Sequence, residues 1–379
     1  MGGWIIKRIK NIYKNMINYE KCLAMFFIIR NNAKNKKDII NFENNLNQNI
    51  FEILYSLKNK KYKFDKYRIF LIRDPKYRLI MSENIKDKIV NHMVSEYILR
   101  PALEPALIDS NVATRKFKGT GYALKIFTKY VNKLMYFGEE IYVLKIDIKK
   151  YFYNIDHKIL IKMIEKKIND YDAIQIIKTI IETTNEPYIN KEIELLKKNE
   201  INRIKKLKIN EYEKNKKISE VLSIPFYIAN KGLPIGNMTS QILAIYYLNE
   251  IDHYIKEDLK IKYYIRYMDD LIMLSTDKKH LKLYYKKICD KLNEFELEIN
   301  NKSNIYKLSN GVSFLGYTFK SNGNLTIRYN NKTIKRIRKK IKYLYKYDYE
   351  KYKKSFASYK GYFNFCNTSL KEEVINFEK

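Results

Sequence analysis

The spacing of apolar and polar residues divides the chain into a helical beginning and a middle that mixes strands with helices. Residues 1–60 are basic, contain few helix breakers and predict helices, including a core helix through the apolar run 22–29. Residues 67–73 and 78–80 have the composition of strands, and the Asp74-Pro75 step between them predicts a turn. A further helix is expected after the second strand.

Three apolar runs in the middle of the chain have the length of buried strands. One run ends at Asp147, so this carboxylate is expected at the end of a strand, where a side chain can point into a cleft. Two others, 263–265 and 271–274, flank Asp269 and Asp270. The adjacent acids are therefore predicted at the turn of a hairpin.

A glycine-rich turn separates the first acid from the other two. It covers residues 232–241 (GLPIGNMTSQ) and precedes the apolar run 242–248, which predicts a buried helix. Glycines around a proline favour a tight loop that brings backbone amides close to a ligand. Thr239 or Ser240 is expected to cap the helix that follows.

The chemistry of these acids depends on their occurring together. Adjacent carboxylates on a tight turn repel each other, and hard divalent cations prefer oxygen ligands. If Asp147 converges on Asp269 and Asp270, the three can hold the two metal ions that clamp the attacking and leaving oxygens of a phosphoryl transfer. For each acid taken alone, a solvated turn explains the sequence as well.

Four motifs, at 147–152, 232–236, 267–270 and 314–317, follow one another in the order of the palm motifs of a reverse transcriptase. The chain resembles this family from about residue 60 to its end. The form Ile-Gly-Asn-x-x-Ser-Gln at 235–241 is most similar to reverse transcriptases of diversity-generating retroelements. Unassociated and antiphage-defence enzymes are near neighbours, whereas retron and group II intron enzymes fit less well.

The resemblance implies an α+β protein with the right-hand polymerase fold, in which the palm is an antiparallel sheet packed on helices. We expect a basic helical region at 1–60, fingers at 61–140, a palm at 141–325 and a helical thumb at 326–379. A charged stretch without Gly or Pro at 190–222 predicts a helical hairpin inserted in the palm. A solvated surface insertion is favoured over an arm that binds RNA or a partner.

The implied activity is that of an RNA-directed DNA polymerase, a nucleotidyltransferase with two Mg²⁺ ions as cofactors; Mn²⁺ is left open. Asp147 and Asp269 would ligate the ions most directly, and Asp270 would participate more weakly. The Ile148 carbonyl would add a backbone ligand. Lys302 is implied as the acid that protonates the leaving pyrophosphate.

The resemblance also assigns residues to the nucleotide and to nucleic acid. Phe152 matches the aromatic steric gate that excludes a ribose 2′-hydroxyl, although a core aromatic is the alternative. The other residues implied at the nucleotide are Lys76, Arg78, Ile235, Gly236 and Gln241. Those implied to bind nucleic acid are Arg73, Arg115, Lys118, Arg336 and Lys339. Without the palm motifs, a solvated hairpin and a plain amphipathic helix would explain most of these basic residues.

One departure from the family concerns fidelity. Many reverse transcriptases have Gln where this chain has Ile235, next to the nucleotide. An apolar side chain cannot make the polar contact that helps to position template and sugar. Relaxed fidelity is therefore expected, which suits an element that miscopies adenines.

Composition supports a polyanionic partner. The 379 residues carry a formal net charge of +32, and Lys and Arg that neutralise phosphates release counterions. An AT-rich genome would also raise the Lys content, whatever the function. The net positive charge therefore favours nucleic acid as the partner, and a membrane surface remains the lesser option. The expected partners are an RNA template, the cDNA/RNA duplex and dNTPs. A structured noncoding RNA and a small accessory protein are left open.

Other features restrict the compartment and the competing classes of function. No apolar run reaches the roughly 18–20 residues of a membrane span. The three cysteines, Cys22, Cys289 and Cys366, fit a reducing cytoplasm and no zinc site. A non-catalytic RNA-binding scaffold is disfavoured by the intact acids, and an RNA-dependent RNA polymerase is disfavoured by Phe152. The motifs do not separate diversification from antiphage defence.

Overall fold

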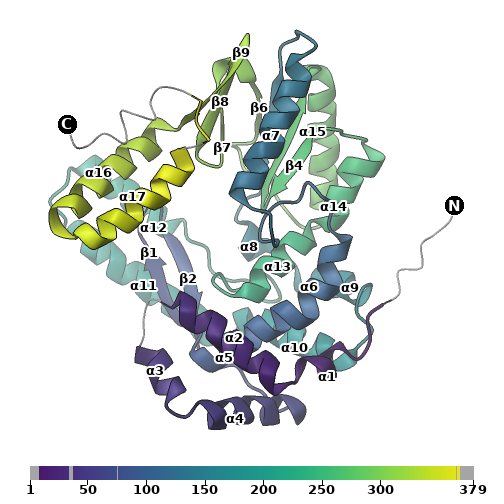
Figure 1. Ribbon diagram of the computed structural model, residues 1–379, viewed down its shortest axis with the longest axis vertical. Helices are drawn as coiled ribbons and strands as arrows, with labels where there is room; N and C mark the ends of the chain where they lie inside the picture. The colour runs from purple at the N-terminus through teal and green to yellow at the C-terminus, as the bar shows by residue number, and fades with distance from the viewer. Residues whose placement is uncertain (1–7, 34–36, 75, 364, 368–379) are drawn as a thin grey trace. The chain divides into compact units, whose positions relative to one another are not determined.

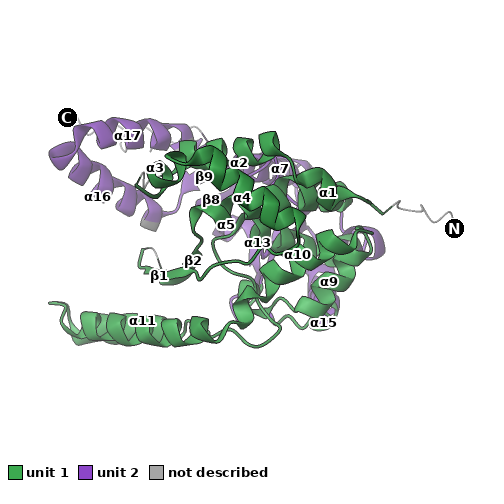
Figure 2. Ribbon diagram, turned by 90° about the horizontal axis from the view of Figure 1, so that it is seen from below, with its two compact units in different colours: residues 1–108, 148–253, 291–298 green, residues 109–147, 254–290, 299–379 purple. Residues whose placement is uncertain are grey.

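The computed structural model describes residues 8–33, 37–74, 76–363 and 365–367. Its helices and strands (Figure 1) form two compact units, each assembled from segments that are distant in the chain (Figure 2). Unit 1 comprises residues 1–108, 148–253 and 291–298. Unit 2 comprises residues 109–147, 254–290 and 299–379. The stretch 141–325 therefore contributes to both units.

Unit 1 begins with helices, as the sequence predicts for this part of the chain. They are α1 (Ile12–Met16), α2 (Tyr19–Asn32), α3 (Lys37–Glu43), α4 (Leu46–Lys58), α5 (Ile85–Val94) and α6 (Arg100–Leu103). Helix α2 starts where the Asn18 side chain accepts a hydrogen bond from the Lys21 amide at 3.0 Å. Its apolar face is buried at Cys22, Phe26 and Ile29, which confirms the predicted core helix.

The predicted strand pair of unit 1 is present as an antiparallel hairpin. Strand β1 (Arg68–Ile72) pairs with β2 (Arg78–Ser82). Leu79 and Met81 alternate with more exposed residues, so one face of β2 is buried. The turn between the strands carries Lys76, as predicted.

The predicted inserted hairpin consists of α11 (Pro187–Lys205) and α12 (Glu211–Leu222). Helix α11 packs against β1, and its Ile189 and Ile193 share a buried cluster with Leu79 and Met81 of β2. The interpretation as a solvated insertion is therefore wrong for α11. The apolar pattern was irregular because two of the buried positions of α11 are the polar residues Lys197 and Glu200.

The remaining helices of unit 1 precede and follow the glycine-rich loop in the chain. They are α8 (Tyr151–Asn154), α9 (His157–Glu165), α10 (Tyr171–Glu182), α13 (Met238–Tyr247) and α14 (Asn249–His253). The predicted cap of α13 is wrong, because Asn237 occupies the N-cap and makes no side-chain cap bond. Thr239 Oγ1 instead donates to Asn91 Oδ1 at 2.7 Å in the core.

The main sheet of unit 2 has four antiparallel strands in the order β4-β5-β3-β6. The strands are β3 (Tyr142–Asp147), β4 (Tyr264–Tyr267), β5 (Asp270–Ser275) and β6 (Asn304–Lys307). Val143 and Leu144 of β3 and Leu271 to Leu274 of β5 are buried, since both strands lie inside the sheet. The three apolar runs of the sequence are thus neighbouring strands.

A second sheet and four helices complete unit 2. The strands are β7 (Val312–Phe314), β8 (Tyr317–Asn322) and β9 (Asn324–Tyr329). The helices are α7 (Thr120–Met135), α15 (Lys278–Asn293), α16 (Asn331–Tyr347) and α17 (Tyr349–Phe363). The last turn of α15 belongs to unit 1. Ile334, Ile337, Ile341 and Leu344 are buried along α16, which confirms the predicted amphipathic helix.

The architecture is α+β, with helices and three antiparallel sheets, which confirms the fold class expected from the sequence. In the parts of the chain that the structure describes, no helix is both long and apolar enough to cross a membrane.

Candidate active site

Two of the three predicted acids lie opposite each other in the main sheet of unit 2. Strands β3 and β5 pair in a register that aligns Asp147 with Asp270. Directly opposite residues of an antiparallel pair point to the same face, with Cβ atoms about 4.5–5.5 Å apart. The two carboxylates therefore share one face at one end of the sheet.

The third acid lies in the tight turn between β4 and β5. Tyr267 pairs with Asp270, so Met268 and Asp269 form a two-residue loop. Met268 has φ of 56° whereas Asp269 is not left-handed, the φ pattern of a type II′ hairpin turn. The predicted hairpin is confirmed, and its geometry brings Asp269 to the strand end that carries Asp147 and Asp270.

Burial and neighbouring charge raise the pKa of Asp269 and of Asp270. Burial is the main cause that raises the pKa of Asp269 to about 6, and the charges of Asp270 and Asp147 raise it further. Burial also raises the pKa of Asp270, partly offset by Lys145, while Asp147 adds to the increase. The three groups thus repel each other at neutral pH, and a cation placed among them would offset this repulsion.

Arg266 supports the turn from inside the unit and was not foreseen from the sequence. It is completely buried, its backbone bonds to Ser110 and Val112, and its guanidinium donates to the Met268 carbonyl at 2.9 Å. Its charge lowers the pKa of Asp269. The available signal was an arginine inside an otherwise apolar and aromatic strand, because a buried charge needs partners.

The loop before β6 holds the end of β3. The Asn300 amide donates to the Asp147 carbonyl at 2.7 Å, and the Asp147 amide donates to Ser303 Oγ at 3.0 Å. Lys302 lies in this loop with an exposed side chain. The structure therefore places the Lys302 backbone next to the strand end that carries Asp147.

The donor set matches the chemistry of a hard cation. Among the described residues, no three side chains of His, Cys, Asp or Glu gather closely enough to form a complete metal site. Asp147, Asp269 and Asp270 nevertheless offer the oxygen ligands that Mg²⁺ prefers, and Mg²⁺ commonly keeps water and phosphate oxygens in its remaining positions. The buried Ile148 follows Asp147 directly and carries the predicted backbone ligand.

In unit 1, the glycine-rich loop is hydrogen-bonded to the β1–β2 hairpin. The Met81 amide donates to the Ile235 carbonyl at 2.8 Å. Gly236 has φ of +139°, and a Cβ there would lie 2.5 Å from the Met81 carbonyl oxygen. Only glycine fits this approach of two backbones without displacement. The side chain of Ile235 packs on the buried cluster that contains Met81.

The other residues predicted at the nucleotide also lie in unit 1. Phe152 is half-buried in α8, and its ring packs edge-on against Tyr151 with centroids 5.8 Å apart. Gln241 is half-buried in the first turn of α13. Lys76 and Arg78 are exposed, and neither side chain bonds to another residue of the described chain. Both are therefore available to an anionic ligand.

The residues predicted to bind nucleic acid fall into two groups. Arg73 forms an ion pair with Glu200 of α11. Lys118 Nζ forms an ion pair with Asp109 Oδ1 at 2.6 Å. Arg115 donates to the Asn111 carbonyl at 3.0 Å. Arg336 and Lys339 are exposed on α16. Arg73, Lys118 and Arg115 thus have structural partners that the sequence did not reveal.

A strand-end acid opposite an acid-bearing hairpin is the arrangement expected of a nucleotidyltransferase that uses divalent cations. The family described as "Reverse transcriptase (RNA-dependent DNA polymerase)" matches residues 59–319, more than half of the chain. The chain therefore belongs to the reverse transcriptase family. This confirms the family that the order of the four motifs predicted.

Solved structures similar to this chain include two telomerases. One is telomerase from Candida albicans in complex with a TWJ fragment of telomeric RNA, at 13% identity and a TM-score of 0.47, covering 75% of this chain and 51% of that one. The other is apo telomerase from Candida tropicalis, truncated from its C-terminal domain, at 14% identity and a TM-score of 0.47, covering 75% and 60%. The chain thus spans about half to three fifths of these telomerase chains. No curated protein sequence matches it.

Proposed function

We propose that this protein synthesises cDNA on an RNA template and serves a diversity-generating retroelement. The observation that carries the catalytic part is the register of β3 and β5, which aligns Asp147 with Asp270 and places Asp269 in the adjoining turn. All three acids belong to the stretch that matches the reverse transcriptase family. The partners of this activity are an RNA template, the growing cDNA/RNA duplex and dNTPs.

In the proposed reaction, a primer 3′-hydroxyl loses its proton to water as its oxygen attacks the α-phosphate of a dNTP, and pyrophosphate leaves with the former α–β bridging oxygen. Asp147 and Asp269 would hold two Mg²⁺ ions most directly, Asp270 would participate more weakly, and the Ile148 carbonyl would be a backbone ligand. When bound, the ions supply charge that stabilises the attacking and leaving oxygens. Lys302 donates a proton to pyrophosphate.

By resemblance to the family, further residues would position the nucleotide. The exposed side chains of Lys76 and Arg78 contact the triphosphate, and the ring of Phe152 excludes a ribose 2′-hydroxyl. Positioning and preorganised charge supply most of the acceleration in phosphoryl transfer. The backbone hydrogen bond between Met81 and Ile235 supports this role. It joins the hairpin that carries Lys76 and Arg78 to the loop that carries Gly236.

Two features support diversification. The form Ile-Gly-Asn-x-x-Ser-Gln at 235–241 is similar to enzymes of diversity-generating retroelements. Ile235 also places an apolar side chain where many relatives have Gln, and this side chain packs on apolar neighbours. We expect Ile235→Gln to reduce misincorporation opposite template adenines. An unchanged misincorporation spectrum would remove this support.

The alternative is an antiphage-defence enzyme that copies a dedicated noncoding RNA. Sequencing the nucleic acid that co-purifies from the native host tests both, with the double variant Asp269→Asn/Asp270→Asn as control. DNA complementary to one host RNA, present only with intact acids, supports cDNA synthesis. Substitutions concentrated at adenines support diversification, whereas faithful copies of one noncoding RNA favour defence. RNA without dependent DNA contradicts the proposal.

A further inference from the structure

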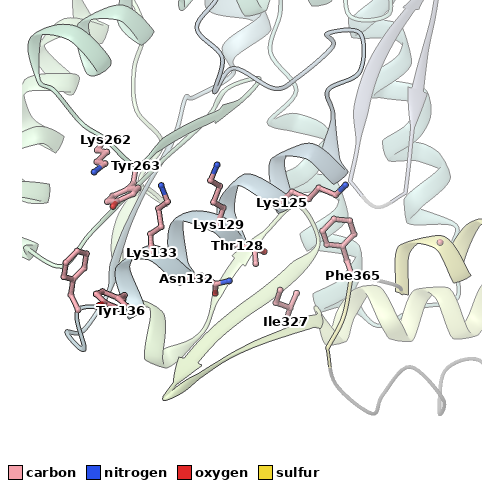
Figure 3. A pocket seen from close by; sticks show the side chains of 12 residues that line it. Lys125, Thr128, Lys129, Asn132, Lys133, Tyr136, Lys262, Tyr263, Ile327 and Phe365 are labelled. Atoms are coloured by element: carbon pink, nitrogen blue, oxygen red, sulfur yellow. The ribbon is translucent and has the colours of Figure 1, made fainter.

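Unit 2 contains a large cavity that the proposed catalytic residues do not line. It has a volume of about 1140 Å³ and lies along α7, between Lys262 and Tyr263 before β4 and Phe365 near the end of the described chain (Figure 3). Pockets for small molecules have volumes of about 300–1,000 Å³. We call this cavity the α7 groove, and its size suits an extended ligand.

The described lining of the α7 groove carries positive charge. Lys125, Lys129 and Lys133 are spaced four residues apart and therefore share one face of α7. They are exposed, and within the described chain none forms an ion pair or hydrogen bond. Lys262 adds a fourth charge from another segment, and none of the described lining residues is acidic. These features select an anion with several charges.

Flat apolar surfaces lie beside the lysines. Tyr136 and Phe137 follow the end of α7 and are 88% and 64% exposed, with ring centroids 5.9 Å apart. Tyr263 and Phe365 add two half-buried rings to the lining. Unpaired bases stack on such rings, and their phosphates pair with lysines. The bases of a duplex are stacked inside it, so a duplex would contact the lysines through its phosphates and would not stack on the rings.

We propose that the α7 groove binds a single strand of nucleic acid outside the catalytic site, and that this strand is RNA. The opposite face of α7, with Leu124, Phe127 and Val131, is buried in the core of unit 2, which fixes the direction of the lysines. The choice of RNA over DNA rests on the proposed function, in which RNA is present before any DNA is made. The groove itself does not depend on that reaction.

The first test removes charge. The triple variant Lys125→Gln/Lys129→Gln/Lys133→Gln keeps good helix formers, and Lys279→Gln/Lys282→Gln/Lys286→Gln removes the same charge from the exposed face of α15. Binding of labelled oligo(U) to the full chain is followed by fluorescence anisotropy over a salt series, in EDTA and without dNTPs. Thermal melting verifies that both variants fold.

The α7 variant is expected to lower the slope of log affinity against log salt by about 2, since each lost phosphate contact contributes about 0.7. At moderate salt, its affinity falls at least about tenfold, whereas the α15 variant changes little. Equal losses in both variants would show a general effect of charge and overturn the proposal. Unchanged affinity in the α7 variant would overturn it as well.

The second test removes the rings and compares ligands. Tyr136→Ala/Phe137→Ala is expected to weaken oligo(U) binding about tenfold without changing the salt slope, because stacking involves no counterion release. Duplex RNA that loses as much affinity would contradict the single-strand site. Oligo(dT) that competes as well as oligo(U) would overturn the choice of RNA. Nucleotide incorporation is not measured, so an inactive polymerase leaves these outcomes unaffected.

Discussion

Asp147 and Asp270 are directly opposed residues of β3 and β5, although 122 positions separate them in the chain. Asp269 precedes Asp270 in the turn, and its pKa is raised by both neighbours in addition to burial. The sheet thus collects like charges at one strand end. Such a collection is costly to the metal-free fold and is characteristic of functional sites.

Asp269→Asn is expected to raise the melting temperature of the metal-free protein by a few degrees. The variant removes a charge whose ionised form is disfavoured by about 3 kcal/mol, judged from a rise of the pKa from 3.8 to about 6. Mg²⁺ should raise the melting temperature of the unmodified protein and not that of the variant. Differential scanning calorimetry in EDTA and in Mg²⁺ measures both. The exposed Asp290→Asn serves as control, and a variant that still responds to Mg²⁺ would argue against Asp269 as a ligand.

The buried carboxylate of Glu200 joins α11 to the β1–β2 hairpin. Burial alone would raise its pKa, but hydrogen bonds from Arg203, Arg73 and Tyr77 lower it to about 2. Because the pKa is lower in the folded state than in the unfolded chain, this cluster stabilises the protein above about pH 4.5. That contribution is lost as the pH falls from about 4.5 towards 2.

Glu200→Gln should therefore lower the free energy of unfolding by about 2 kcal/mol at pH 7. The difference from the unmodified protein should shrink as the pH falls through this range. Urea unfolding at a series of pH values measures it. A difference that stays constant with pH would show that the charge of Glu200 does not stabilise the cluster.

Gly236→Ala should destabilise unit 1 by about 2 kcal/mol, since its Cβ would meet the Met81 carbonyl oxygen at 2.5 Å. Gly119→Ala is a matched control, because Gly119 has a similar φ of +145° but no atom within 4 Å of its Cβ position. Chemical unfolding compares the two. Equal losses would indicate backbone strain alone, without the close approach of the loop to β2.

Phe152→Val should relax discrimination between dNTPs and rNTPs by about 10- to 100-fold, in the range that shape exclusion supplies. The ring is only half-buried and packs edge-on against Tyr151, so the protein should remain folded. The measurement is the ratio of kcat/KM for dTTP and UTP on one primer–template. A ratio that is unchanged, with dTTP incorporation retained, would assign Phe152 to the core instead of the gate.

The sequence predicted the local parts of the site and not its long-range supports. The strands that end at Asp147 and start at Asp270 were visible because short apolar runs determine buried strands. The partnership of Arg73 with Glu200 and the burial of Arg266 were not visible, because they depend on contacts across more than a hundred residues. Thr239 or Ser240 is the cap that the sequence predicts for α13, but Thr239 donates a tertiary hydrogen bond to Asn91 instead.

The central claim is that Asp147, Asp269 and Asp270 catalyse DNA synthesis on RNA. The most direct measurement is Mg²⁺-dependent incorporation of dTTP by the purified chain on a poly(rA)/oligo(dT) primer–template, beside Asp147→Asn and Asp269→Asn. The account predicts incorporation that EDTA abolishes and that falls at least about 10²- to 10³-fold in each variant, as expected when preorganised charge is removed from a transition state. Incorporation that persists in both folded variants would contradict it.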